Sequence, residues 1–250
     1  MPAHPSSDRE GGVSVTARDP WCVVPVKAFH AAKQRLGPVH GAEFRRALAR
    51  AMLEDVLAAA TAVDALGGVA VVTADPEVRS LAGGFGVRLL DEPRADEGLS
   101  SAVAAAARRL AAEDCRAMLV LPADIPGVTP ADIRSLLDGH PPAPGLTIVP
   151  DRDGDGTNAI LASPPDALPF AYGPNSFSRH VAGARQAGCT VRVVTSPAIG
   201  FDLDHPADLS AFARTPSPTR TWRFLQTPGL GAGALFADAA GNASIAEFRP

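Results

Sequence analysis

The sequence predicts an α/β fold in one domain, with a mostly parallel sheet flanked by helices. Short apolar runs typical of buried strands alternate with segments of helical periodicity, at spacings of roughly 20 to 35 residues that are typical of βαβ units. The chain has 250 residues, of which 46% are hydrophobic and 20% charged. That composition is ordinary for a globular protein with a sizeable core.

The first half of the chain alternates regularly. A helix is expected at about 41–63, where apolar side chains recur every three or four residues. Asp75-Pro76 and Thr129-Pro130 each join an N-cap residue to a first-turn proline, so a helix should begin at both. An alanine-rich helix should end near Ala112. The apolar runs predict strands at 21–26, 69–73, 87–90 and 118–121.

The second half is less regular, and its composition suggests where the domain ends. Strands are expected at 146–149, 158–161 and 191–194, a helix at 176–187, a last extended piece at 200–204 and a final helix to about 213. The polar segment 1–19 predicts a disordered leader, and 20–214 the folded domain. Because Pro, Gly, Ser and Ala dominate 215–250, we expect a loosely attached or disordered tail there.

Charge and cysteine content exclude several classes of partner. The net charge is −4 and basic clusters are absent, which argues against binding nucleic acid or anionic membranes. No apolar run approaches the ~20 residues of a membrane span. Cys22, Cys115 and Cys189 are odd in number and far apart. They predict neither a disulfide framework nor a zinc site and fit a reducing cytoplasm, where we expect a soluble protein.

The strand at 118–121 ends in a Pro-Ala-Asp-Ile-Pro turn that carries Asp124. Two prolines should hold this carboxylate rigidly at the carboxyl edge of the sheet, where α/β proteins bind ligands. Asp202 and Asp204 are two residues apart, so on an extended backbone they project to the same side. The other interpretation is a solvated strand end in which Asp204 caps the next helix. With Asp124, the set predicts an all-oxygen site for Mg²⁺ or Mn²⁺.

The Asp/Gly-rich segment 151–158 begins like a calcium-binding EF-hand loop. The twelfth position, which needs a glutamate, is Ala162, and no flanking helix is evident, so calcium is disfavoured. A plain turn remains possible. So does a loop whose amides and Thr157 hydroxyl hold an anion.

Two further segments have an ordinary and a functional interpretation. Ser176 follows Gly173 and opens a helix, where it is either a simple N-cap or part of an anion site. His180 is either a satisfied surface histidine or a catalyst. Lys27, Lys33 and Arg35 form a solvated basic loop or neutralise the phosphates of a nucleotide.

Taken in order, these motifs resemble the CofC/FbiD guanylyltransferases of coenzyme F-420 biosynthesis. The resemblance covers about 21–213 and implies a single-domain, Rossmann-like nucleotidyltransferase fold of the MobA and nucleotide-diphospho-sugar transferase type. The motifs are Val24-Pro25-Val26-Lys27 with Lys33-x-Arg35-Leu36, Leu121-Pro122-Ala123-Asp124-Ile125-Pro126, Gly156-Thr157-Asn158, Gly173-Pro174-x-Ser176 and Asp202-x-Asp204.

The resemblance implies transfer of GMP from GTP to the phosphate of phosphoenolpyruvate, 2-phospho-L-lactate or 3-phospho-D-glycerate. The product would pass to a downstream transferase, and the oligomeric state stays open. The implied ligands of Mg²⁺, or of Mn²⁺, are Asp124, Asp202 and Asp204, and the implied binders of the acceptor carboxylate are Thr157, Gly173 and Ser176.

The same resemblance places Lys27, Lys33 and Arg35 along the GTP triphosphate and makes Asp124 and Lys27 the catalytic residues. The family usually has Gly-Leu-Asn where this chain has Gly98-Leu99-Ser100. If the asparagine contacts the nucleotide, the contact of Ser100 should be weaker or mediated by water.

Two alternatives compete with this interpretation. Transferases acting on molybdopterin or sugar phosphates usually begin with a glycine-rich loop, but Val26-Lys27-Ala28-Phe29 contains no glycine. A non-catalytic nucleotide-binding domain need not keep the metal carboxylates, whereas all three are present.

Overall fold

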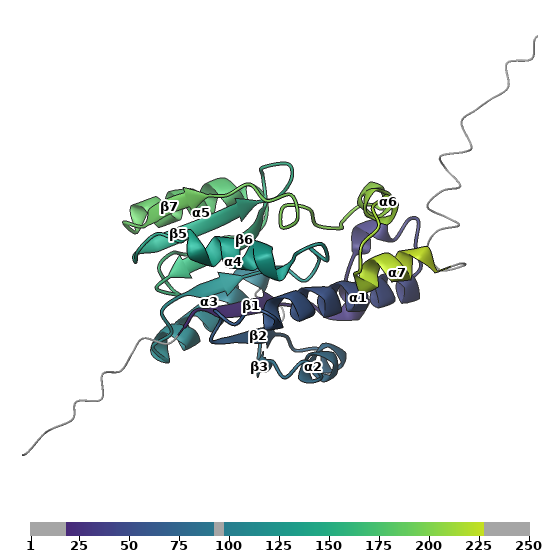
Figure 1. Cartoon of the computed structure of the whole chain (residues 1–250), viewed down its shortest axis with the longest axis horizontal. Coiled ribbons are helices and arrows are strands. Elements are labelled where there is room, and N and C mark those ends of the chain that lie inside the picture. The colour runs from purple at the N-terminus through teal and green to yellow at the C-terminus, as the bar shows by residue number, and fades with distance from the viewer. Residues whose placement is uncertain (1–18, 93–97, 228–250) are drawn as a thin grey trace, which may run out of the picture.

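The structure is a computed structural model and describes residues 19–92 and 98–227. Within these residues, seven strands form one sheet (Figure 1). In sheet order they are β3 (Arg88–Leu90), β2 (Gly68–Val72), β1 (Trp21–Pro25), β4 (Met118–Val120), β6 (Thr157–Ser163), β5 (Gly145–Pro150) and β7 (Thr190–Val193). Strand β6 pairs antiparallel with β4 and β5, and the other neighbours are parallel. The predicted mostly parallel sheet is confirmed.

Helices cover both faces of this sheet. One face packs against α3 (Gly98–Ala112) and α5 (Ser176–Gln186). The other packs against α1 (Ala42–Thr61), α2 (Pro76–Gly83), α4 (Pro130–Asp138), α6 (Pro206–Arg214) and α7 (Arg220–Gln226). Alternate residues of β1 serve the two faces: Val23 lies on the α3 side, and Cys22 and Val24 lie on the α1 side. Strands buried on both faces explain the continuous apolar runs in the sequence.

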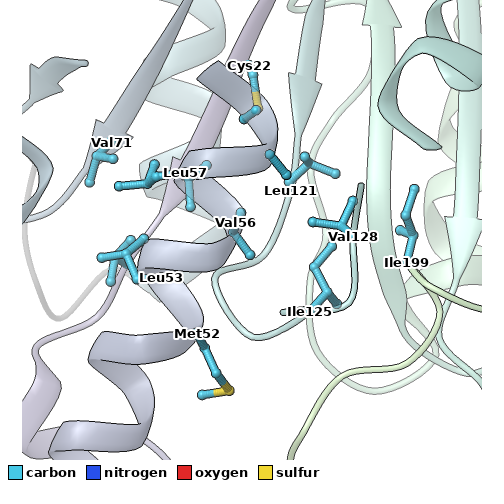
Figure 2. Close-up of a cluster of buried hydrophobic side chains, with 14 of the residues drawn as sticks. Cys22, Met52, Leu53, Val56, Leu57, Val71, Leu121, Ile125, Val128 and Ile199 are labelled. Carbon is cyan, nitrogen blue, oxygen red and sulfur yellow. The ribbon is translucent and has the colours of Figure 1, made fainter. Parts of the chain in front are cut away.

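The core under α1 also anchors the turn that carries Asp124. In Figure 2, Val56 and Leu57 of α1 point toward the sheet, and Ile125 and Val128 of the turn lie in the same cluster. Ile125 is fully buried. Burying one such side chain stabilises a fold by roughly 1.5–3 kcal/mol. The turn is therefore fixed by packing as well as by its prolines.

The helix starts predicted at Asp75-Pro76 and Thr129-Pro130 are confirmed. The Asp75 carboxylate accepts hydrogen bonds from the backbone N–H groups of Glu77 and Val78, at 2.7 and 3.1 Å. Thr129 and Asp132 form a reciprocal capping box at the start of α4. Between β1 and α1, the basic loop contains two short 3₁₀ turns, η1 (Phe29–Ala31) and η2 (Gln34–Leu36).

Two expectations need correction. Residues 201–204 run as a loop outside the sheet, not as a strand. The tail expected from 215 is wrong for residues 220–226, because these form α7, which lies along α1 (Figure 1). The carboxylate of Asp55, on α1, accepts hydrogen bonds from the backbone N–H groups of Arg220 and Thr221, each at 2.8 Å.

Other expectations fall outside the described residues. These are the leader up to 18 and the tail from 228; residues 93–97 also lie outside the described part of the chain. Within 19–92 and 98–227, none of the helices has both the length and the apolar character needed to cross a membrane.

Candidate active site

The turn after β4 brings Asp124 next to the Asp202–Asp204 segment. The backbone carbonyl of Asp124 accepts a hydrogen bond of 3.0 Å from the N–H of Leu203. Leu203 is fully buried between the two aspartates. One carboxylate oxygen from each of Asp124, Asp202 and Asp204 lies within 4.8 Å of the others. The three residues predicted as one cluster are therefore together.

Lys33 lies inside this cluster. Its ammonium Nζ is 2.6 Å from Oδ2 of Asp124 and 2.6 Å from Oδ1 of Asp204. Arg35 adds a second cation, 2.8 Å from Oδ2 of Asp204. Burial favours the neutral amine and lowers the pKa of Lys33, but the two carboxylates and their hydrogen bonds outweigh it and raise that pKa overall. Lys33 is thus a fixed positive charge in the site.

Asp202 has a different environment from the other two aspartates. Burial and the neighbouring charge of Asp124 raise its pKa, while a hydrogen bond of 3.2 Å from the Asn158 amide opposes that shift. The Asn158 amide also donates to the carbonyl of Ile199, at 2.9 Å, and so joins β6 to the loop that carries Asp202. For Asp204, burial raises the pKa, but Lys33 and Arg35 bring it below its usual value.

This donor set fits a divalent cation. All three groups are carboxylates, and hard oxygen ligands of this kind suit Mg²⁺ or Mn²⁺. Burial is the largest cause of the raised pKa of Asp202, and the charge of Asp124 adds to it. Among the described residues, the three carboxylates also outnumber the two cations that contact them, Lys33 and Arg35. The cluster therefore has both the ligand type and the excess charge that a metal site needs.

A cavity of about 790 Å³ opens beside the cluster. Its lining includes seven of the predicted site residues, namely Lys27, Lys33, Arg35, Ser100, Asp124, Gly173 and Asp204. They come from the loop after β1, the first turn of α3, the turn after β4 and the loops before α5 and α6. Three predicted residues do not line this cavity, namely Asp202, Thr157 and Ser176.

Thr157 and Ser176 nevertheless lie together, next to Gly173. The Ser176 hydroxyl donates to Oγ1 of Thr157 at 3.2 Å. The N–H of Ser176 donates to the carbonyl of Gly173 at 3.0 Å. Behind the pair, Nδ1 of His180 is 3.0 Å from Oγ1 of Thr157. The predicted acceptor-binding residues form one polar group.

The loop before β6 holds these hydroxyls in place. The Asp151 carboxylate accepts from the N–H groups of Asp155 and Gly156, at 3.0 and 2.8 Å, which makes a tight turn. A side chain at Gly156 would collide with that carboxylate. The carbonyl of Asp155 accepts from the N–H of Phe177, at 3.1 Å, and so ties the loop to α5. An Asp/Gly turn is therefore present, and it places Thr157 against Ser176.

Ser100, in the first turn of α3, contacts the loop before α5. Its hydroxyl accepts a hydrogen bond of 2.9 Å from the N–H of Tyr172, next to Gly173. Ser100 also lines the cavity. No sequence pattern indicated the contact with Tyr172.

Three local expectations are wrong. Asn175, not Ser176, is the N-cap of α5, and its φ of 54° is a left-handed conformation that Asn and Gly tolerate. His205, not Asp204, is the N-cap of α6. His180 is fully buried, not a surface histidine. The apolar neighbours of His180 on the helix could have indicated its burial.

Comparison with known proteins agrees with this geometry. The family described as "Guanylyl transferase CofC like" matches residues 21–233. A phosphoenolpyruvate guanylyltransferase of Rubrobacter xylanophilus is 41% identical over 193 residues, which cover 76% of this chain and 91% of that protein. A 3-phospho-D-glycerate guanylyltransferase of Colwellia psychrerythraea is 34% identical over 196 residues, or 78% and 92% of the two chains.

The fold has counterparts among solved structures. A protein of Desulfovibrio desulfuricans, provisionally described as a nucleotide-diphospho-sugar transferase, superposes with a TM-score of 0.66. The match covers 82% of this chain and 93% of that one at 17% sequence identity, so it supports the fold alone. The family match and the relatives go further: this chain is a nucleotidyltransferase and belongs to the family of CofC-like guanylyl transferases.

Proposed function

We propose that the protein transfers GMP from GTP to the phosphate of a small phospho-carboxylic acid and releases pyrophosphate, in a reaction that depends on Mg²⁺. The observation that carries this proposal is the convergence of Asp124, Asp202 and Asp204 beside a cavity also lined by cationic side chains. The hydroxyls of Thr157 and Ser176 contact each other, and Ser176 is hydrogen-bonded to Gly173, which lines that cavity.

The reaction joins two anions, so charge is the main obstacle. An oxygen of the acceptor phosphate attacks the α-phosphorus of GTP in line, and the bond to the pyrophosphate oxygen breaks. The acceptor phosphate is already ionised, so no protein base or nucleophile is required. A divalent cation held by the three aspartates would offset negative charge on the reacting phosphates.

The side chains of this protein supply the remaining charge and the positioning. Lys27 and Arg35 line the cavity and are placed to neutralise the triphosphate. The buried ammonium of Lys33 contacts the carboxylates of Asp124 and Asp204. In this proposal it lies between these carboxylates and the phosphates of GTP. Holding both substrates by fixed groups converts a bimolecular reaction between anions into one within a single site.

Gly173, Thr157 and Ser176 bind the acceptor carboxylate in this proposal. Ser176 is the first residue of α5, and its N–H already donates to the carbonyl of Gly173, so the proposed contacts to the anion come from the hydroxyl pair. Gly173 has a φ of 111° and lines the cavity. Any other residue at this position would have a strained backbone, which explains why glycine is found there.

The relatives suggest which acceptor to test first. Phosphoenolpyruvate is the acceptor named for the Rubrobacter protein, and 3-phospho-D-glycerate for the Colwellia protein. The resemblance to the coenzyme F-420 enzymes adds 2-phospho-L-lactate. We propose phosphoenolpyruvate as the preferred acceptor, with the product consumed by a downstream transferase of coenzyme F-420 biosynthesis.

The test is pyrophosphate release from GTP and Mg²⁺ with each of these three acids and with a sugar 1-phosphate. We expect release with at least one acid, and most with phosphoenolpyruvate. Asp202→Asn should lower kcat/KM at least about 100-fold, since metal charge stabilisation is worth several kcal/mol. The control Asp153→Asn, an exposed aspartate on a nearby loop, should have little effect. Release with none of the acids, or only with the sugar phosphate, would overturn the proposal.

A further inference from the structure

His180 is a fully buried histidine directly behind the Thr157–Ser176 pair. Both of its ring nitrogens have a partner. Nε2 is 2.8 Å from the backbone N of Ala171, and Nδ1 is 3.0 Å from Oγ1 of Thr157. The rings of Tyr172 and Phe170 pack edge-on against it, at centroid distances of 4.9 and 6.5 Å.

The contact with Ala171 determines which ring nitrogen carries the hydrogen. A backbone N–H is always a donor, so Nε2 must supply a lone pair. Burial, with a smaller contribution from Arg179, lowers the pKa of His180 to about 4, so the ring is neutral at neutral pH. A neutral imidazole has one N–H, and it is therefore on Nδ1, donating to Thr157.

Counting the hydroxyl hydrogens then shows whether the Thr157–Ser176 pair can donate a hydrogen bond to a ligand. Thr157 and Ser176 have one hydroxyl hydrogen each. Ser176 uses its hydrogen in the bond to Thr157, and Thr157 receives a second bond from His180. The hydrogen of Thr157 stays free for a ligand. With the opposite tautomer, Thr157 would have to donate to His180, and neither hydroxyl could donate to a ligand.

We propose that His180 is a positioning residue that makes the Thr157–Ser176 pair a hydrogen-bond donor toward the carboxylate of the acceptor. The N–H of Ala171 donates to Nε2 of His180 and so fixes the tautomer. The N–H at Nδ1 of His180 then donates to the Thr157 hydroxyl, whose own O–H is left to donate to the anion. The identity of the anion rests on the function proposed above. The polarity of the pair rests on these contacts alone.

The first test needs no variant and no activity. In the full-length protein without substrates, ¹⁵N NMR of the histidine rings shows which nitrogen of His180 carries hydrogen. We expect Nδ1 to be protonated and Nε2 to be the acceptor, coupled across a hydrogen bond to the amide of Ala171. A hydrogen on Nε2, or on both nitrogens at neutral pH, would overturn the proposal.

The second test uses two variants that keep opposite halves of the imidazole. His180→Asn places an amide N–H near the position of Nδ1 and loses the acceptor for Ala171. His180→Gln can reach Ala171 with its carbonyl and loses the donor to Thr157. If His180 only filled space or paired with Ala171, the Gln variant would be at least as good as the Asn variant.

We expect His180→Gln to raise KM for phosphoenolpyruvate by about 10- to 100-fold, the range for one hydrogen bond to a charged group. His180→Asn should change that KM by no more than about 3-fold, and KM for GTP should change little in either variant. Equal effects, or a larger effect of Asn, would contradict the proposal. If no acid supports pyrophosphate release, the proposed function fails, while the ring-nitrogen measurement still decides the tautomer.

Discussion

The ammonium nitrogen of Lys33 lies 2.6 Å from Oδ2 of Asp124, one of the three clustered aspartates. Asp204 contacts the same nitrogen at the same distance. The lysine side chain is only 7% exposed, so water screens these contacts weakly. Lys33 was expected along the triphosphate. The structure places its ammonium against the carboxylates of Asp124 and Asp204, where it offsets part of their negative charge.

The first prediction concerns that balance. Lys33→Met keeps the aliphatic stem and removes the charge. Without divalent cations the variant should lose about 1–3 kcal/mol of unfolding free energy, because partly buried carboxylates lose their partner. Adding Mn²⁺ should then raise its Tm more than that of the unaltered protein. Differential scanning fluorimetry with and without Mn²⁺ measures both effects.

Arg35→Met is the matched control, since Arg35 also contacts Asp204 but is 66% exposed. It should change the Mn²⁺-dependent Tm shift much less. An equal Mn²⁺ shift in the Lys33 variant and the unaltered protein would show that the ammonium does not compete with a cation.

Ser176→Ala tests the acceptor site. Ser176 is buried against Thr157, so its loss removes one member of the hydroxyl pair. We expect KM for the acceptor to rise about 5- to 50-fold with a smaller change in kcat, as for a contact made mainly in the ground state. Ser178→Ala, an exposed serine on the same turn, should leave both constants unchanged. A fall in kcat alone would place Ser176 in the chemical step instead.

Asp55→Ala tests the attachment of α7. The Asp55 carboxylate is 7% exposed and caps α7 through the N–H groups of Arg220 and Thr221. Its loss should cost about 2 kcal/mol, which lowers the Tm of a protein of this size by about 4–8 °C. Glu54→Gln weakens two more exposed ion pairs, with Arg50 and Arg220, and should cost less. Equal Tm values for both variants would contradict this role.

Two histidines with lowered pKa, the buried His180 and the half-buried His140, predict how stability depends on pH. Burial is the main cause that lowers the pKa of both His140 and His180 to about 4. Between about pH 6.5 and pH 4 the unfolded chain binds protons that the folded chain does not. The free energy of unfolding should therefore fall as pH drops through this range, by up to about 3 kcal/mol per histidine. Urea unfolding at a series of pH values measures the slope, and His140→Gln should reduce it. An unchanged slope would contradict the assignment for His140.

The sequence predicted the sheet well because its strands are buried on both faces and read as apolar runs. It also predicted Asp124, Asp202 and Asp204 as a cluster, since each follows or lies near a sheet edge. It missed α7, because the short segment 220–226 is held mainly by a partner far away in the chain, Asp55. A carboxylate in the middle of α1 gives no local sign that it caps another helix.

The tertiary contacts of the site were also beyond the sequence. His180 is near Thr157 only because the antiparallel strand β6 and helix α5 meet, and sequence spacing does not encode that approach. The same holds for Ser100, whose partner Tyr172 lies 72 residues further along the chain. The sequence motifs predicted which residues form the site, whereas the hydrogen bonds between them required the structure.

The most direct test of the account is ³¹P NMR of the product formed from GTP, Mg²⁺ and phosphoenolpyruvate. Transfer of GMP creates a P–O–P bond between two different phosphorus atoms, so we expect two mutually coupled resonances that appear together with pyrophosphate. Pyrophosphate accompanied only by free GMP would show hydrolysis of GTP instead of transfer. That result, repeated with 2-phospho-L-lactate and 3-phospho-D-glycerate, would contradict the proposed function.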